Sequence, residues 1–291
     1  MESSDTSGRL AIIAGHGFLP LYVAEAARER GENPYIIVLK NEGNRDFSQF
    51  DHSFVGVGDA LLIQSIIKKH GIARVVLSGG VHHRPEVSEI RPTFGALLRL
   101  PGILRTLISG GDDAVLRMVI SLFESMGCKV YGVHQIAPNL LAEVGAINGS
   151  PLTEYDRRDI RVAAHAAKIL GELDVGQGAI CVGGRVVALE GVEGTDAMLM
   201  RVAELRAAGR ISQRKKGVLV KLCKPQQDLR ADLPTIGPAT MRGAAAAGLA
   251  GIAVEAGRAL VVEREECIAI TQQEGLFLYG LDLAAKNMGL E

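Results

Sequence analysis

The chain has 291 residues, of which 47% are hydrophobic and 22% are charged, and its formal net charge is -1. This length suits two domains, and the apolar content is high enough for packed cores, which excludes a disordered chain. Binding along a nucleic-acid duplex needs clustered Lys and Arg, and the balanced charge gives no such excess. We therefore expect no nucleic-acid partner.

The N-terminal segment has neither the basic stretch nor the apolar stretch of a signal peptide. No part of the sequence reaches the roughly 18 to 20 apolar residues of a membrane span. The four cysteines form no Cys-x-x-Cys pair, which argues against a zinc knuckle or a redox pair. They are Cys128, Cys181, Cys223 and Cys267. We expect a cytoplasmic protein in a reducing compartment, with at most peripheral contact to the inner membrane.

Short apolar runs alternate with amphipathic segments in the first half of the chain. Predicted strands lie at 10–14, 35–39, 53–57, 74–77 and 129–133, and predicted helices at 20–30, 59–69 and 113–126. The second helix has Asp59 as its N-cap. Continuous apolar strands that alternate with helices indicate a parallel sheet covered on both faces. We therefore predict a Rossmann-like parallel-sheet domain over residues 9–140.

The second half has a different pattern, and we predict a linker over 141–155 before it, since this region contains Asn148, Gly149 and Pro151. A helix over 153–170 is expected to start at a Thr153 cap. A hairpin over 179–189 is expected to turn at a Gly-Gly pair. A helix to residue 207, capped by Thr195 or Asp196, and a strand over 217–222 follow. The fold class is therefore α/β, with a C-terminal mixed α/β catalytic domain over 156–285.

Two segments of the first half have features of nucleotide sites. Gly15 and Gly17 follow the first strand and precede a helix, where backbone N–H groups can receive a phosphate. Pro20 stands where the dinucleotide fingerprint has its third glycine, so a tight turn without a ligand is an equal alternative. Arg84 follows another strand and a glycine pair, at the sheet edge where open α/β sheets bind ligands. Its alternative is a surface loop.

The second half contains two segments that mix charges. Residues 190–196 hold three carboxylates and a hydroxyl, and residues 221–235 hold two Lys, one Arg and two Asp. Mg²⁺ binds carboxylate oxygens and bridges phosphates, while Lys and Arg neutralise the remaining charge. The mixture is typical of a diphosphate site. Because Pro225 and Pro234 favour a loop, a solvated polar loop is the alternative for the second segment.

Several segments of the sequence, including these two, resemble those of a known family. The segments 174–179, 193–199, 224–238 and 247–258, together with 14–20, 84–85 and 111–114, resemble the LpxI-type UDP-2,3-diacylglucosamine pyrophosphatases. The resemblance extends from about residue 9 to residue 281. One position differs, since this chain has His134-Gln135 where the family has His-Glu.

The resemblance implies a Rossmann-like N-terminal domain and a C-terminal domain of a fold particular to the family, with the lipid-linked UDP-sugar between them. It implies hydrolysis of UDP-2,3-diacylglucosamine to UMP and 2,3-diacylglucosamine 1-phosphate in lipid A biosynthesis, with Mg²⁺ required. The essential Asp of the family's Arg-x-Asp-Leu-Pro-Thr segment corresponds to Asp232.

On this basis Asp232 is expected to bind the metal or to orient the attacking water, with Asp196 and Glu193 completing the metal shell. The expected substrate-binding residues are Gly15, Gly17, Arg84, Thr195, Lys224 and Arg230.

Residues 94–108 place Leu and Ile around Arg99 and Arg105, a pattern that fits contact with a membrane surface or with acyl chains. A core helix with two snorkelling arginines is the alternative. A homodimer is expected as the commonest oligomer. Two rival functions are a nicotinamide-dependent oxidoreductase, disfavoured by the incomplete glycine fingerprint, and a non-catalytic nucleotide-sugar-binding protein.

Overall fold

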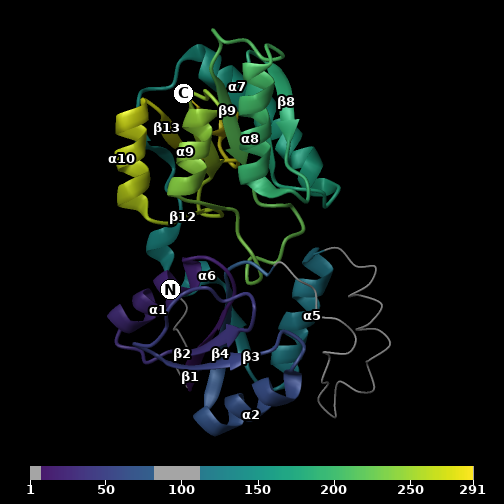
Figure 1. Cartoon of the computed structure of the whole chain (residues 1–291), viewed down its shortest axis with the longest axis vertical. Helices are drawn as coiled ribbons and strands as arrows, with labels where there is room; N and C mark the ends of the chain where they lie inside the picture. Colours follow the sequence, from purple (N-terminus) through teal and green to yellow (C-terminus); the bar gives the residue numbers. More distant parts are fainter. Residues whose placement is uncertain (1–7, 82–111, 291) are drawn as a thin grey trace. The chain divides into compact units, whose positions relative to one another are not determined.

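The computed structural model describes residues 8–81 and 112–290, and the chain divides into two compact units (Figure 1). The N-terminal unit runs to Pro138 and also includes Asp228–Asp232. The C-terminal unit comprises Asn139–Gln227 and Leu233–Glu291. A segment late in the sequence is thus part of the N-terminal unit.

The N-terminal unit is built on a parallel five-stranded sheet of order β3-β2-β1-β4-β5. Its strands are β1 (Arg9–Ala14), β2 (Tyr35–Leu39), β3 (Asp51–Val55), β4 (Ile72–Ser78) and β5 (Lys129–Tyr131). All five residues of β2 are buried, as expected of a strand covered on both faces. The predicted parallel sheet is confirmed, and the strand order reverses between β1 and β4.

Helices α1 (Leu19–Glu29), α2 (Ala60–His70) and α5 (Asp112–Ser125) lie between these strands in the chain, and the short α6 (Val133–Ile136) follows β5. The predicted cap of α2 is confirmed, because the Asp59 carboxylate accepts a hydrogen bond from the Leu62 N–H at 3.1 Å. One face of the sheet packs against α2 and α5, where Ile63 and Phe123 join Ile13 in a buried cluster.

The C-terminal unit has a mixed six-stranded sheet of order β6-β13-β11-β9-β7-β8. Its strands are β6 (Gly145–Gly149), β7 (Gly178–Val182), β8 (Arg185–Leu189), β9 (Gly217–Lys221), β11 (Gly251–Glu255) and β13 (Phe277–Leu281). The three central strands β9, β11 and β13 are parallel, whereas β6 and β7 run antiparallel to their neighbours. A small parallel pair, β10 (Thr235–Ile236) and β12 (Leu260–Val261), completes the unit. The predicted mixed α/β domain is confirmed.

Helices cover both faces of this sheet. They are α7 (Glu154–Glu172), α8 (Gly194–Ala207), α9 (Pro238–Ala246) and α10 (Arg264–Glu274), with short 3₁₀ turns η2 (Pro138–Leu140) and η3 (Lys286–Gly289). Leu219 packs with α8, α9 and α10, which lie together on one face (Figure 1). Its neighbours Val218 and Val220 point to the other face and pack against α7.

The hairpin and the cap of α7 agree with the sequence. The Asp159 carboxylate accepts hydrogen bonds from the N–H groups of Gly183 and Gly184, at 2.8 and 2.6 Å, and so fixes the predicted turn. Thr153 caps α7, and its hydroxyl accepts from the Asp156 N–H at 3.2 Å.

Two features of the C-terminal unit were not predicted. Strand β6 lies in the region predicted as a linker and pairs with β13 at the sheet edge. The predicted cap of α8 by Thr195 or Asp196 is wrong, because the helix starts at Gly194 and its N-cap, Glu193, makes no side-chain capping bond. The Thr195 hydroxyl has other partners, which are described below.

Among residues 8–81 and 112–290, no helix has both the length and the apolar character that crossing a membrane requires.

Candidate functional site

The glycine turn after β1 is fixed by backbone contacts with the end of β4. The Gly15 N–H donates to the Ser78 carbonyl at 2.9 Å, and His16 and Gly80 exchange two backbone hydrogen bonds at 2.7 and 3.0 Å. A Cβ atom on Gly15 would lie 2.3 Å from the Gly80 carbonyl oxygen, which is backbone and cannot turn away. Gly15 is therefore required by the close approach of two strand ends.

Gly17 differs from Gly15. Its φ is +93°, and a Cβ atom there would meet nothing within 4 Å. Its N–H donates to the Asn44 side-chain oxygen at 3.0 Å, so this amide already has a partner. Beside it the guanidinium of Arg45 lies 3.5 Å from the centre of the Phe18 ring. The Arg45 guanidinium is therefore stacked on Phe18, the residue just before α1.

We predict that Gly15→Ala lowers the free energy of unfolding by about 1–3 kcal/mol, as overpacking of a filled site does. Gly17→Ala is the matched control, because it adds the same methyl group in open space and costs only the left-handed conformation, about 1 kcal/mol. Urea denaturation of both variants checks the difference. Equal losses would show that the contact with Gly80 does not restrict the turn.

Arg230 anchors the segment Asp228–Asp232 within the N-terminal unit. Its guanidinium binds Asp228 through Nη2, at 2.7 Å, and through Nε, at 3.0 Å, and its Nη1 donates to Glu124 of α5 at 2.9 Å. The hydrogen bond from Arg230 is the main cause that lowers the pKa of Asp228. Ala231 packs against the apolar core of the same unit. Arg230, predicted as a substrate contact, thus binds carboxylates of its own unit.

This pairing makes stability depend on pH. A lowered pKa of Asp228 means that the pair stabilises the fold above the unfolded Asp pKa of about 3.9, and that this contribution is lost as the pH falls through the lower folded value. The free energy of unfolding is expected to fall between pH 5 and pH 3, which roughly bracket this transition. We predict that this decrease is smaller in Arg230→Met than in the wild type, because the variant lacks the pair. Urea denaturation at both pH values checks this. Identical losses would contradict the pairing.

Asp232 ends the anchored segment and is exposed. Because Arg230 and Ala231 hold the backbone just before it, the carboxylate is presented from a fixed position rather than from an unsupported loop. This is the arrangement that positions a functional side chain.

Lys224 contacts the end of α7. Its ammonium lies 2.7 Å from the Asp174 carboxylate, and Asp174 has a left-handed φ of 54°. The Gln226 amide donates to the Gly171 carbonyl at 2.8 Å. The segments that begin at Asp174 and at Lys224, both part of the family resemblance, therefore meet here. Lys224, like Arg230, has a carboxylate partner within its own unit.

Thr195 lies in a buried polar cluster with Glu190 and Lys221, the last residue of β9. Its hydroxyl accepts from the Lys221 ammonium at 2.7 Å and donates to Glu190 Oε1 at 2.5 Å. The side chains of Lys221 and Glu190 are only 6% and 8% exposed. Both residues lie in the segments of mixed charge, but no role was predicted for either of them. The apolar strand Gly217–Lys221 ends in a charge, which is the signal that marks Lys221.

Glu193 and Asp196, predicted as metal ligands, are exposed at the start of α8. Glu193 lies 3.7 Å from Arg201. They belong to the C-terminal unit, whereas Asp232 belongs to the N-terminal unit. In the described part of the chain, no group of three or more His, Cys, Asp or Glu side chains is arranged to hold a metal ion.

Some predicted features lie outside the described residues. They are Arg84 and the segment 94–108 with Arg99 and Arg105. At the position that differs from the family, the Gln135 side chain accepts a hydrogen bond from the Gly132 N–H at 2.9 Å and so caps α6. An amide oxygen makes this bond as a carboxylate would.

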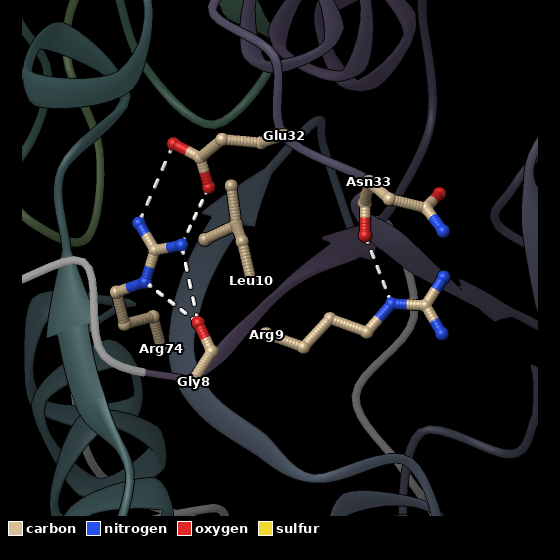
Figure 2. Close-up of a pocket in the computed structure, with 6 residues that line it drawn as sticks. All are labelled: Gly8, Arg9, Leu10, Glu32, Asn33 and Arg74. Carbon is tan, nitrogen blue, oxygen red and sulfur yellow. Dashed lines mark hydrogen bonds and ion pairs between the residues drawn. The ribbon is translucent and has the colours of Figure 1, made fainter.

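A recess of about 380 Å³ lies at the amino end of β1 (Figure 2). Figure 2 shows that Arg74 binds Glu32 with two nitrogens and also the Gly8 carbonyl, and that Arg9 donates to the Asn33 carbonyl. Ligands of open parallel sheets bind at the opposite end, beyond the carboxyl ends of the strands. The recess is therefore held by structural pairs and is not a candidate site.

Two family models match this chain, one in each half. The model of the LpxI N-terminal domain matches residues 9–140, and that of the LpxI C-terminal domain matches residues 143–279. The chain is 40% identical over 277 residues to the UDP-2,3-diacylglucosamine pyrophosphatase LpxI of Caulobacter vibrioides, covering 94% of this chain and 98% of that protein.

Two solved structures give weaker matches. The UDP-glucose 4-epimerase of Thermus thermophilus, in complex with NAD, is 14% identical with a TM-score of 0.29, over 94% of this chain and 85% of that chain. The GalE-like L-threonine dehydrogenase of Cupriavidus necator is 13% identical with a TM-score of 0.29, over 97% and 94%. Scores this low support no argument about this chain. The two domain models and the identity to the Caulobacter protein do, and the chain belongs to the LpxI family.

Proposed function

We propose that this protein hydrolyses the diphosphate of UDP-2,3-diacylglucosamine to UMP and 2,3-diacylglucosamine 1-phosphate, a step of lipid A biosynthesis. The observation that carries the proposal is the 40% identity to a pyrophosphatase of that name, over nearly the whole of both chains. The substrate partner is accordingly a lipid-linked UDP-sugar.

In this reaction water attacks a phosphorus atom that carries anionic oxygens, so catalysis needs a group that positions the water and accepts its proton. Asp232 is the residue that we assign to this task. Its carboxylate is exposed, and the Arg230 contacts with Asp228 and Glu124 hold the backbone that carries it.

We propose Mg²⁺ as the cofactor. Mg²⁺ in proteins is usually held by one or two carboxylates together with substrate phosphates, not by a cage of protein ligands alone. The exposed carboxylate of Asp232 fits that mode. When bound, Mg²⁺ neutralises phosphate oxygens. Asp232 is the ligand that we propose, and Glu193 and Asp196, which belong to the other unit, are the alternative carboxylates.

The N-terminal unit is Rossmann-like, because the order β3-β2-β1-β4-β5 corresponds to the first five strands of that fold. We also propose a cytoplasmic location, peripheral contact with the inner membrane, and a homodimer. Cell fractionation and light scattering test these.

The function is tested by incubating the purified protein with UDP-2,3-diacylglucosamine and Mg²⁺, with and without excess EDTA, while UMP release is followed. We expect release with Mg²⁺, loss with EDTA and recovery when Mg²⁺ is restored. Release of UMP that persists in EDTA would contradict the proposed requirement for Mg²⁺. Substrate that is bound but not cut would favour a nucleotide-sugar-binding protein.

A further inference from the structure

His134 lies at the carboxyl end of the parallel sheet in the N-terminal unit. Strand β5 ends at Tyr131, and His134 is part of the short helix α6 that follows it. Because β5 runs parallel to β4, both strands end on the side of the sheet where open α/β folds bind their ligands. His134 therefore occupies a position from which a side chain can contact a ligand.

His134 is also close to the segment Asp228–Asp232, which belongs to the same unit. A Cβ atom on Gly132 would lie 2.4 Å from His134 Cε1 and 2.7 Å from the Leu229 carbonyl oxygen. The imidazole ring and the backbone of the segment thus pack against the same glycine. The φ of Gly132 is -81°, which other residues adopt equally well, so a glycine is needed here for space.

The His134 imidazole has no hydrogen bond that would give it a structural role. Within residues 8–81 and 112–290, its Nδ1 atom is buried without a hydrogen-bond partner. Nε2 also makes no hydrogen bond to a described residue, but this atom is not buried. Buried polar atoms of native proteins are nearly always paired, and an exception often marks a functional group. His134 thus keeps one accessible ring nitrogen at the cost of one unpaired nitrogen.

The state of the ring suits an anionic ligand. Burial lowers the pKa of His134, so the imidazole is neutral at pH 7. A neutral imidazole carries one N–H, which it can place on either nitrogen. A diphosphate at this pH presents acceptor oxygens and selects the form with the hydrogen on the accessible Nε2.

We propose that Nε2 of His134 donates a hydrogen bond to a phosphate oxygen of the substrate diphosphate. The inference rests on the proposed function and adds to it a phosphate-binding residue of the N-terminal unit. The segment that packs beside His134 ends in Asp232, the residue assigned to the attacking water, so the reacting phosphate has to approach this segment.

The test compares His134→Phe, which keeps a ring but removes both nitrogens, with His134→Gln, whose amide N–H can replace the donor. His52→Phe is the matched control, at an exposed histidine near the amino end of β3. The dissociation constant of UDP in the presence of Mg²⁺ is measured by calorimetric titration. Loss of a hydrogen bond to a charged oxygen predicts binding weakened about 10- to 100-fold in His134→Phe. We expect His134→Gln to bind more tightly than His134→Phe, and the control to match the wild type.

Thermal unfolding separates a ligand contact from a structural role. Phenylalanine removes a buried nitrogen that has no partner, so the melting temperature of His134→Phe should equal or exceed that of the wild type. Weakened UDP binding that accompanies a lower melting temperature in both His134 variants would assign the residue to the fold and overturn the inference.

Unchanged UDP binding in His134→Phe, equal losses in the two variants, or absence of UDP binding by the wild type would also overturn it. If the wild type binds UDP but does not cleave UDP-2,3-diacylglucosamine, the proposed function fails by itself. The comparison of UDP affinities then still tests the contact between His134 and the diphosphate.

Discussion

Replacement of Asp232 by alanine lowers kcat by about 10²–10⁴-fold, the range associated with loss of a positioned acid or base. The melting temperature should stay close to that of the wild type, because the side chain is exposed and Arg230 and Ala231 still anchor the segment. Steady-state assays with UDP-2,3-diacylglucosamine, together with thermal unfolding, measure both quantities.

Two controls separate chemistry from general charge effects. Asp232→Asn keeps the size of the side chain but removes the negative charge, and we expect it to be as inactive as the alanine variant. Glu29→Ala removes an exposed carboxylate at the end of α1, and we expect no change in kcat. An alanine variant of Asp232 that retains wild-type kcat would remove this residue from the mechanism.

Replacement of Lys221 by methionine destabilises the protein by about 3–5 kcal/mol, the cost of leaving one charge of a buried pair without its partner. The side chains of Lys221 and Glu190 are 6% and 8% exposed, so water cannot compensate Glu190 when the ammonium is removed. The Thr195 hydroxyl also loses its donor. The free energy of unfolding from urea denaturation, followed by far-ultraviolet circular dichroism, measures the effect.

Lys224→Met is the matched control, because it removes the same group from an ion pair that is closer to water. The side chains of Lys224 and Asp174 are 15% and 32% exposed, and we expect a loss of about 1 kcal/mol. If Lys221→Met costs no more than Lys224→Met, the buried cluster does not have the energetic role that its geometry indicates.

Much of the fold was predictable because parallel strands that are buried on both faces consist of consecutive apolar residues, as in Tyr35–Leu39. The capping residues Asp59 and Thr153 were predictable because short polar side chains bind the first free amides of a helix. Strand β6 was not predictable, because its sequence Gly-Ala-Ile-Asn-Gly shows no alternation of apolar and polar residues. Its partner in the sheet, β13, is distant in the sequence.

The site was less predictable, because composition shows which charges are present but not which ones pair. Arg230 and Lys224 were expected to bind a diphosphate, yet each contacts a carboxylate of its own unit, and Glu124 lies 106 residues before Arg230. The pairing of Lys221 with Thr195 was not predicted, because the two residues are 26 positions apart. Such long-range pairs are set by strand order, which local patterns do not contain.

The most direct test of the central claim is the identity of the products formed from UDP-2,3-diacylglucosamine and Mg²⁺, read by mass spectrometry. We predict UMP and 2,3-diacylglucosamine 1-phosphate in equal amounts, which places the cut within the diphosphate. Formation of UDP and free diacylglucosamine would place the cut at the sugar bond, and unchanged substrate would show no hydrolysis. Either of these results would contradict the proposed function.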